Sequence, residues 1–171
     1  MRPHITLLLH NIRSTHNVGS LFRTAEGFGV AKIVLSGYTP YPDLALVGQR
    51  DPRLPHIVEK LTAQIHKTAL GAETMVSFEY MEDVRGWLCH NNEQDGLPVI
   101  ALEQAPDSVL LPEFQAPAAC ALLLGEEVHG IEDDLLSWCD HVVEIPMFGQ
   151  KESFNVSVAG GIALYELMNA R

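Results

Sequence analysis

The sequence predicts an α/β fold in which helices cover both faces of a mostly parallel sheet. Short β-rich apolar runs alternate with stretches of helical periodicity from one end of the chain to the other. This alternation is typical of a sheet whose strands are buried on both sides. With 171 residues, of which 47% are hydrophobic and 19% charged, the chain has the size and composition of one globular domain. We therefore expect a single domain over residues 1–171.

The chain is expected to begin with a strand, a helix and a second strand. His4–His10 reads HITLLLH, an apolar run of strand length, and Ala31–Ser36 is a similar run. Val18–Phe28 repeats apolar residues every three or four positions, which places them on one helix face. Gly37–Pro55 contains four prolines, so it is predicted to be a long loop holding a short helical turn at most. Loops of this length in compact domains are usually functional.

The rest of the chain continues the alternation without a repeat, a low-complexity tract or a linker. Apolar β-rich runs predict strands at Met75–Phe78, Val99–Leu102, Ala119–Leu124 and His141–Ile145. Helical spacing predicts helices at His56–Ala69, Met81–His90, Glu132–Cys139 and Asn155–Asn169.

Several classes of protein are excluded by composition. The longest apolar run, Ala118–Leu124, has seven residues, whereas a membrane span needs about 20. The opening residues do not read as a secretory signal, and we expect a cytoplasmic protein without a membrane partner. The three cysteines form no CxxC pair, and the eight histidines form neither HExxH nor an i, i+4 pair. Neither a disulfide scaffold nor a metal site is predicted.

The charge is distributed unevenly along the chain. The net charge is −11, which usually counts against a nucleic-acid partner. Residues 1–70, however, hold eight Lys or Arg against four Asp or Glu, while the remaining residues hold three against eighteen. Any polyanion is therefore expected to meet the N-terminal half.

The familiar nucleotide-binding motifs are absent. The sequence has no Gly-Lys dipeptide, which excludes a P-loop, and no GxSxG elbow. Gly27–Gly29 follows a predicted helix and lacks the third glycine of a dinucleotide fingerprint, so it reads as a helix stop.

A first segment with polar residues follows the first predicted strand, over Asn11–Val30. Open α/β sheets place their ligand crevice at such strand ends. Arg23 lies further along, within the predicted helix. Asn17 is equally compatible with an ordinary helix N-cap. The polar residues directly after the strand are Asn11, Arg13, His16 and Asn17.

Two further segments follow later strands. Leu122–Ile131 ends a strand in Gly125, where bare backbone would allow a ligand to approach, although an ordinary strand-to-helix turn explains it equally well. Glu144–Gly161 leads from a strand into the last helix, with Ser153 or Asn155 as the expected N-cap. Two consecutive glycines at 160 and 161 lower helix stability, so tight packing is expected there.

Taken together, the three segments resemble the TrmH-type SPOUT methyltransferases, which methylate the ribose 2′-hydroxyl of tRNA or rRNA with S-adenosylmethionine. The patterns that carry the resemblance are NxRxxxNxGxxxRTAExFG, LxGxExxGI and IPMxGxxxSxNVSVA, and the resemblance extends over Ile5–Leu167. It implies an S-adenosylmethionine cofactor, an RNA partner, a homodimer and a C-terminal deep trefoil knot. It also implies a minimal form of the family, without an N-terminal RNA-binding extension.

The resemblance also implies roles for individual residues. The positions that match functional residues of the family are Asn17, Arg23, Glu127, Ser153 and Asn155. Those expected to contact the cofactor are Leu102, Leu124, Gly125, Glu126, Gly130, Ile145, Pro146, Met147, Ser153 and Phe154. Phe154 replaces a usual leucine, and Gly160–Gly161 stands where alanines are common. Both departures keep the chemistry of the position.

RNA and a second copy of the chain are the expected partners. Phosphate contacts are assigned to basic residues of the N-terminal half, namely Arg13, Arg23, Arg50 and Arg53. In the family, the arginine matching Arg23 has been proposed as a general base, but a guanidinium is not deprotonated in proteins. A phosphate clamp is therefore the favoured role. The first and last helices, with Gly160–Gly161, are the expected contact between two copies.

Two alternative functions remain open. An enzyme of the same fold that methylates a base nitrogen would need an acidic general base at the reacting centre, and the NxGxxxR pattern argues for ribose instead. A catalytically idle RNA-binding module would have lost the cofactor residues. Here Gly125, Ile145, Ser153 and Asn155 are all present.

Overall fold

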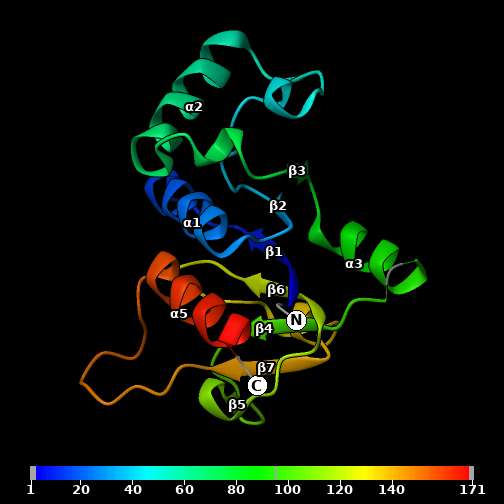
Figure 1. The fold of residues 1–171 in the computed structure, drawn as a ribbon, viewed down its shortest axis with the longest axis vertical. Coiled ribbons are helices and arrows are strands. Elements are labelled where there is room, and N and C mark those ends of the chain that lie inside the picture. The colour runs from blue at the N-terminus through cyan, green and yellow to red at the C-terminus, as the bar shows by residue number, and fades with distance from the viewer. Residues whose placement is uncertain (1–2, 95, 170–171) are drawn as a thin grey trace.

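A single parallel sheet organises the molecule. The computed structural model describes residues 3–94 and 96–169, and Figure 1 shows the chain as a ribbon. Within these residues, the strands form one sheet in the order β3-β2-β1-β6-β4-β7-β5, and every pairing between them is parallel. The strands are β1 (His4–His10), β2 (Lys32–Ser36), β3 (Phe78–Met81), β4 (Val99–Leu102), β5 (Val109–Leu110), β6 (Ala119–Leu124) and β7 (His141–Glu144).

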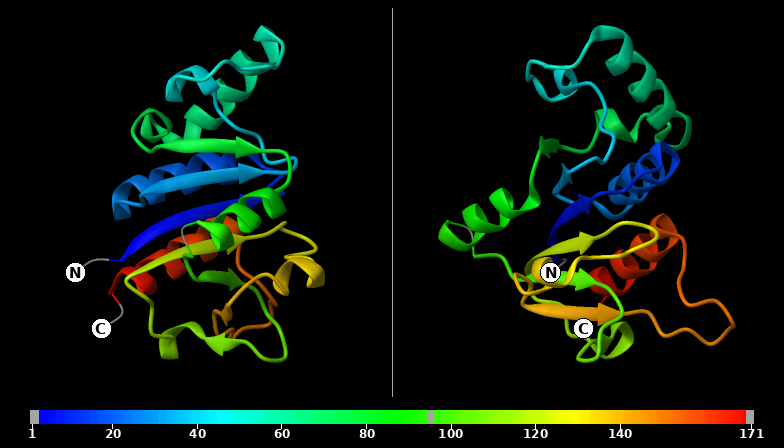
Figure 2. Two further views of the ribbon diagram at one scale, coloured as in Figure 1. Left: turned by 90° about the vertical axis from the view of Figure 1, so that its right-hand side faces the viewer. Right: turned by 180° about the vertical axis from the view of Figure 1, so that it is seen from behind.

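Helices cover both faces of the sheet, as the views in Figure 2 show. Helices α1 and α5 pack side by side on one face, and α2 packs on α1. Helices α3 and α4 contribute to the core on the other face. The helices are α1 (Thr15–Phe28), α2 (Pro55–Ala69), α3 (Val84–Glu93), α4 (Asp133–Leu136) and α5 (Val156–Asn169), with short 3₁₀ turns η1 (Leu44–Val47), η2 (Ala72–Thr74) and η3 (Leu111–Glu113). The predicted α/β class with helices on both faces is confirmed.

The central strands explain the two cores. Along β1, Ile5, Leu7 and Leu9 enter the cluster that contains α1 and α5 residues, whereas Leu8 enters the cluster on the opposite face. All four are fully buried. Since successive side chains of a strand point to opposite faces, a strand buried on both sides must be apolar at every position. The uninterrupted apolar run Leu7–Leu9 has this origin.

Local sequence signals set the ends of α1 and its contact with α2. Ser14 is the N-cap, and its side chain accepts a hydrogen bond from the Asn17 backbone N–H. The helix ends at Gly29, which adopts the left-handed conformation. A Cβ atom at Gly19 would lie 2.1 Å from Thr68 Oγ1, so this glycine allows α1 and α2 to approach closely. The alternative that Asn17 caps the helix is wrong, because the cap lies three residues earlier.

Several predicted boundaries differ from the structure. The strand predicted at Met75–Phe78 and the helix predicted at Met81–His90 both begin three residues later, as β3 and α3. The reason is that η2 extends the turn after α2, which leaves Met75 70% exposed and makes Phe78 the first buried strand residue. The helix predicted at Glu132–Cys139 is only the short α4, and the two-residue strand β5 is too short to give a pattern.

Gly160 allows α5 to pack closely against its own chain. A Cβ atom at this position would lie 2.7 Å from Leu21 Cδ2 and 2.9 Å from Leu124 Cδ1. The expected tight packing is therefore present, but Gly160 faces α1 and β6 and is buried. Its assignment to a surface that meets a second copy is wrong. Gly161 is only partly buried, and a Cβ there would meet Thr24 Cγ2 at 3.7 Å.

Replacement of Gly160 by valine should destabilise the fold. The added side chain overfills a packed core, so we expect Gly160→Val to lower the free energy of unfolding by about 1–3 kcal/mol. Gly161→Ala is the matched control. Its methyl group has room, and alanine favours the helix by up to about 1 kcal/mol. Urea denaturation measures both variants. An unchanged free energy of unfolding in Gly160→Val would contradict this packing.

Candidate active site

The candidate site lies at the carboxyl edge of the sheet, where the strand order reverses. Strand β6 lies between β1 and β4, although β2 and β3 follow β1 in the chain and lie on its other side. The loops that follow β1 and β6 therefore meet at the switch point, the usual place for a ligand in an open α/β sheet. These loops carry the first two of the three sequence patterns.

A chain of hydrogen bonds joins one residue from each pattern. The Asn17 side-chain amide donates from Nδ2 to Glu127 Oε1 at 3.0 Å. The Asn155 amide donates in turn from Nδ2 to Asn17 Oδ1 at 3.2 Å. Asn17 thus connects α1 to the loop after β6 and to the start of α5. The structure brings together three of the five residues assigned as functional.

The Glu127 carboxylate is held as an anion. Its oxygens also accept hydrogen bonds from the backbone N–H groups of Arg13, at 3.2 Å, and Ser14, at 3.4 Å. Partial burial raises the pKa of Glu127, but the hydrogen bonds from Asn17 and from the backbone outweigh it, so the net shift is downward. An ionised carboxylate only accepts hydrogen bonds, and this fixes the direction of the Asn17 amide.

Asn155 is oriented by its role as the cap of α5. Its Oδ1 accepts hydrogen bonds from the Ser157 backbone N–H at 3.0 Å and from the Ser157 hydroxyl at 2.7 Å. Its amide nitrogen is thereby directed at Asn17. Of the two predicted caps, Asn155 rather than Ser153 fills the position, and it does so while contributing to the site.

A cavity of about 290 Å³ adjoins this hydrogen-bond chain and contains Glu127 in its wall. Nine of the ten residues assigned to cofactor contact line it, namely Leu102, Leu124, Gly125, Glu126, Gly130, Ile145, Met147, Ser153 and Phe154. Pro146 is the exception. Lining residues that were not among the assigned cofactor contacts or functional positions are Glu103, Gln104, Val128, His129, Glu144, Glu152, Val156 and Ala159. Glu103 and Gln104 directly follow β4, so their place at a strand end was the available signal.

The loop after β6 forms one wall of the cavity and is tightly closed. Glu126 and Gly130 exchange two backbone hydrogen bonds, of 3.1 and 2.9 Å. Gly130 has φ of 70°, and a Cβ there would lie 2.1 Å from Glu103 Oε2. The same carboxylate oxygen accepts a hydrogen bond from the Ile131 N–H at 2.9 Å. Glu103 therefore connects the end of β4 to this loop.

Gly125 allows the loop after β6 to close. A Cβ atom here would lie 2.5 Å from Ile131 Cγ1 and 2.7 Å from the Gly130 carbonyl oxygen. The bare backbone is required so that the chain can fold back on itself.

The four arginines assigned to RNA differ in their surroundings. Arg13 forms an ion pair with Glu126 at 3.0 Å while its side chain stays 71% exposed. Arg23 lies on α1 and Arg50 follows η1, and both are exposed. Their side chains form no hydrogen bond or ion pair with the described residues. Arg53 is engaged in the fold and holds the pKa of Asp51 at about 2 through side-chain hydrogen bonds. It also donates to the Tyr41 and Pro42 carbonyl oxygens, so it is poorly placed to bind a phosphate.

Neither a metal cluster nor a membrane helix is found in the part of the chain that the structure describes. Residues 3–94 and 96–169 contain no group of three or more His, Cys, Asp or Glu side chains placed to hold a metal ion. Within the same ranges, no helix is long and apolar enough to cross a membrane.

Two of the cysteine thiols are unreactive at neutral pH. Burial raises the pKa of the Cys120 and Cys139 thiols to about 11, so both are protonated.

Proteins of known class are similar to this chain in sequence and in fold. The model of the SpoU rRNA methylase family matches residues 53–165. The 23S rRNA (guanosine-2′-O-)-methyltransferase RlmB of Nitrosomonas europaea is 32% identical over 96% of the chain, which corresponds to 55% of that protein. The chain spans only 55–61% of the length of three curated relatives that it matches.

Two solved structures show the same fold. The SpoU methyltransferase AviRb from Streptomyces viridochromogenes, solved with AdoMet, has a TM-score of 0.77 at 17% identity, covering 98% of this chain and 58% of that one. A structure described as giving insights into the 2-OH methylation of C/U34 on tRNA has a TM-score of 0.70 at 22% identity. In that case 96% of this chain and 94% of the other are covered.

Removal of the Glu127 charge should make the fold less sensitive to acid. Because the pKa of Glu127 is lower in the folded state, its contribution is present above the ordinary glutamate pKa and is lost as pH falls through the lowered value. Glu127→Gln should therefore lose less free energy of unfolding than the wild type between about pH 6 and about pH 3.

The matched control is Glu59→Gln, which changes an exposed carboxylate on α2 that has no hydrogen bond or ion pair to the described residues. Urea denaturation at both pH values gives the comparison. Equal acid sensitivity of Glu127→Gln and the wild type would show that the hydrogen bonds to Glu127 do not hold its charge.

Proposed function

The chain belongs to the SpoU rRNA methylase family, and from this premise we propose that it is an S-adenosylmethionine-dependent RNA methyltransferase that methylates a ribose 2′-hydroxyl in rRNA or tRNA. The observation that carries the proposal is the hydrogen-bond chain Glu127–Asn17–Asn155 beside the cavity. It joins three of the five residues that match functional positions of this family. The relatives named as rRNA and tRNA 2′-O-methyltransferases support the reaction class.

The cavity suits S-adenosylmethionine. Apolar side chains from three strand ends and the folded loop after β6 make its walls. Five carboxylate residues also line it, at positions 103, 126, 127, 144 and 152. When bound, S-adenosylmethionine supplies a methyl group on a positively charged sulfur, and a negative environment favours that charge. The closed loop between Glu126 and Gly130 holds backbone and carboxylates in place before any ligand arrives.

The chain's own residues provide orientation and electrostatic stabilisation. The hydrogen bond between Asn17 and Asn155 connects α1 to the start of α5, whose first turn lines the cavity. The Ser153 hydroxyl lines the cavity and has no hydrogen bond to the described residues, so it is available to the cofactor or the ribose hydroxyl. Methyl transfer is an in-line displacement, and such positioning supplies much of its acceleration.

Arg23 is proposed to clamp a phosphate rather than to remove a proton. Asn17 and Arg23 are six residues apart on α1, which turns their side chains by about 120° relative to each other. Arg23 therefore does not face the Asn17–Glu127 pair of its own chain. We assign it to RNA that is bound in the site of a second copy.

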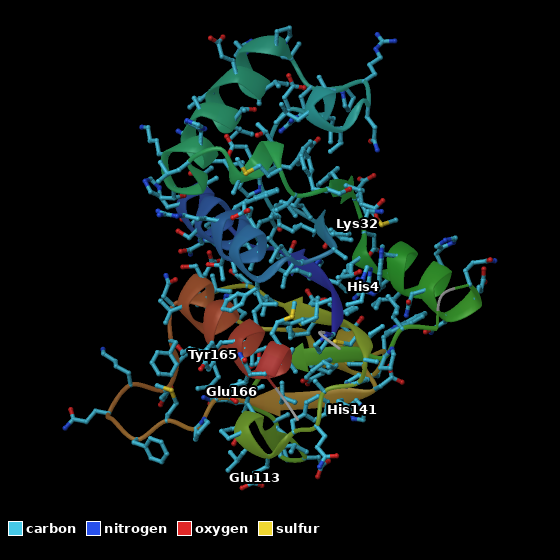
Figure 3. The ribbon with its side chains drawn as sticks, viewed as in Figure 1. His4, Lys32, Glu113, His141, Tyr165 and Glu166 are labelled. Carbon is cyan, nitrogen blue, oxygen red and sulfur yellow. The ribbon has the colours of Figure 1, made fainter. Side chains whose placement is uncertain are left out.

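A homodimer through α1 and α5 is part of this proposal. The last helix exposes a row of apolar side chains that includes Val158 and Tyr165, the latter 57% exposed and in edge contact with Phe28 of α1. Figure 3 labels Tyr165 and its neighbour Glu166 on this helix. An exposed apolar surface of this kind is typical of an interface. A second copy that covers it would bring the exposed Arg23 of one chain towards the other.

The deep trefoil knot and the single domain also remain proposals. The position of β6 between β1 and β4 and the packing of α5 on α1 support a knot formed by the segment from β6 to α5. Continuous packing of α1 on both α2 and α5 supports one domain over 1–171. An rRNA or tRNA substrate places the proposed activity in the cytoplasm.

The site of methylation separates the ribose enzyme from a base methylase. We expect the chain to transfer labelled methyl groups from S-adenosylmethionine to in vitro transcripts of bacterial rRNA or tRNA. After alkaline hydrolysis the label should appear in dinucleotides, because a 2′-O-methyl group removes the hydroxyl that attacks the adjacent phosphate. Label in mononucleotides would instead indicate base methylation.

Calorimetric titration with S-adenosylhomocysteine tests the proposed cofactor separately. Absence of binding at millimolar ligand would contradict the proposal that the cavity holds S-adenosylmethionine.

Two substitutions distinguish the roles of Arg23. A phosphate clamp needs positive charge, so Arg23→Lys should keep partial activity while Arg23→Ala loses about 10²-fold in single-turnover rate. A general base would instead shift the pH profile of Arg23→Lys to lower pH. S-adenosylhomocysteine affinity should be unchanged in both variants, which controls for folding. An unchanged single-turnover rate in Arg23→Ala would exclude a catalytic role.

A further inference from the structure

A second cavity lies at the same edge of the sheet, beside the first. It has a volume of about 670 Å³ and is formed by the loop after β1, the loop after β2, the end of β3 and one side of α2. The residues that carry the argument are Arg13, Tyr38, Tyr41, Arg53 and Tyr80. None of the three sequence patterns includes the tyrosines.

The floor of this cavity is a stack of planar groups. The Tyr41 and Tyr80 rings are stacked with centroids 4.0 Å apart and planes 20° apart. On Tyr41 lies the Arg53 guanidinium, whose Cζ is 3.5 Å from the ring centroid. Arg53 is held in this position by Asp51. The floor is therefore rigid and already complete without a ligand.

The loop after β2 is equally fixed. The Thr39 hydroxyl donates to the Leu9 carbonyl oxygen and accepts from the Ile12 N–H, both at 3.0 Å. The Tyr38 N–H donates to Asn11 Oδ1 at 3.2 Å, and the Tyr80 hydroxyl donates to the Gly37 carbonyl oxygen at 2.8 Å. These contacts connect the loop to β1 and β3.

Tyr38 is the unexplained residue on this rigid loop. Its side chain is 52% exposed, although the residues on both sides of it are held by the fold. Its backbone N–H is held by Asn11 Oδ1, so the residue is fixed on the loop while its side chain stays exposed. A large aromatic side chain exposed on a fixed loop is suited to stacking, because little backbone entropy is lost when a ligand binds.

Polar contacts connect the second cavity to the first. Arg13 lines this cavity, and its side chain is paired with Glu126, which lines the other. The Ser14 N–H, at the rim, donates to Glu127 of the hydrogen-bond chain. The two cavities are thus connected through the Arg13–Glu126 pair and the Ser14–Glu127 hydrogen bond.

We propose that this second cavity binds a nucleobase of the substrate RNA next to the methylated ribose, stacked on Tyr38 with Arg13 at the adjoining phosphate. The inference rests on the proposed function. Single-stranded RNA is commonly recognised by splayed bases that stack on aromatic or guanidinium planes. The exposed ring of Tyr38 and the guanidinium of Arg13 offer such surfaces.

The test titrates the protein with each of the four ribonucleoside 5′-monophosphates and follows the affinity by NMR. The titration is made in the presence of saturating S-adenosylhomocysteine, so that an adenine base cannot bind in the first cavity instead. We expect at least one nucleotide to bind, with Tyr38→Ala weakening it on the order of 10-fold and Tyr38→Phe retaining most of the affinity.

The control variant is Met75→Ala, which removes a side chain of comparable exposure at the opposite, amino-terminal edge of β3. It should bind nucleotides as the wild type does. S-adenosylhomocysteine affinity reports whether Tyr38→Ala is folded, and Tyr38→Phe provides a second folded comparison that keeps the ring.

The outcomes distinguish this inference from the proposed function. If methyl groups are transferred to ribose but Tyr38→Ala leaves nucleotide affinity and the half-saturating RNA concentration unchanged, the base site is overturned and the function stands. If nucleotides bind in a Tyr38-dependent manner but no methyl group is transferred to ribose, the function fails and the base site stands. Absence of binding by all four nucleotides overturns the base site.

Discussion

The parallel pairing of β6 with β1 is the contact on which the rest of the structure depends. The register sets Ala119–Leu124 beside His4–Leu9, so residues more than a hundred positions apart become neighbours. This pairing places the loop after β6 next to the start of α1, and the Glu127–Asn17 hydrogen bond follows from it. It also brings Leu124 beneath α5, where Gly160 leaves room for its side chain. The sheet, the site and the position of the last helix therefore share one cause.

Local pattern predicted the fold class, whereas most residues that line the cavity were assigned through the resemblance to a family. Strands buried on two sides are apolar in long runs, and residues directly after them lie at the carboxyl edge, so pattern alone gave the edge but not the individual cavity residues. Strand order could not be predicted in this way, because an apolar strand such as β6 carries no mark of the partner it pairs with. Nor could the reason for Gly125, since its neighbours Gly130 and Ile131 come into contact only when the loop closes.

Counting charges along the chain overstated the surface available to RNA. The N-terminal half carries an excess of positive charge, but Arg53 is engaged with Asp51 and backbone carbonyls, and Lys32 is paired with Glu79. In the other half, Arg85 is surrounded by Asp83, Glu132 and Asp134 and connects α3 to the region of α4. Burial and pairing decide which cations reach solvent, and neither is visible in a count. Arg13, Arg23 and Arg50 are the assigned arginines that stay exposed.

Among these, Arg13 occupies the boundary between the two cavities. Its backbone N–H holds Glu127 while its side chain is paired with Glu126, so one residue contacts both carboxylates at the tip of β6. The Arg13 side chain is 71% exposed, whereas the Glu126 side chain is only 11% exposed. The pair therefore places a guanidinium at the surface directly above a largely buried carboxylate, and the backbone contact to Glu127 does not depend on the Arg13 side chain. In the proposed function, a movement of the guanidinium towards the substrate would leave the hydrogen-bond chain between α1 and α5 intact.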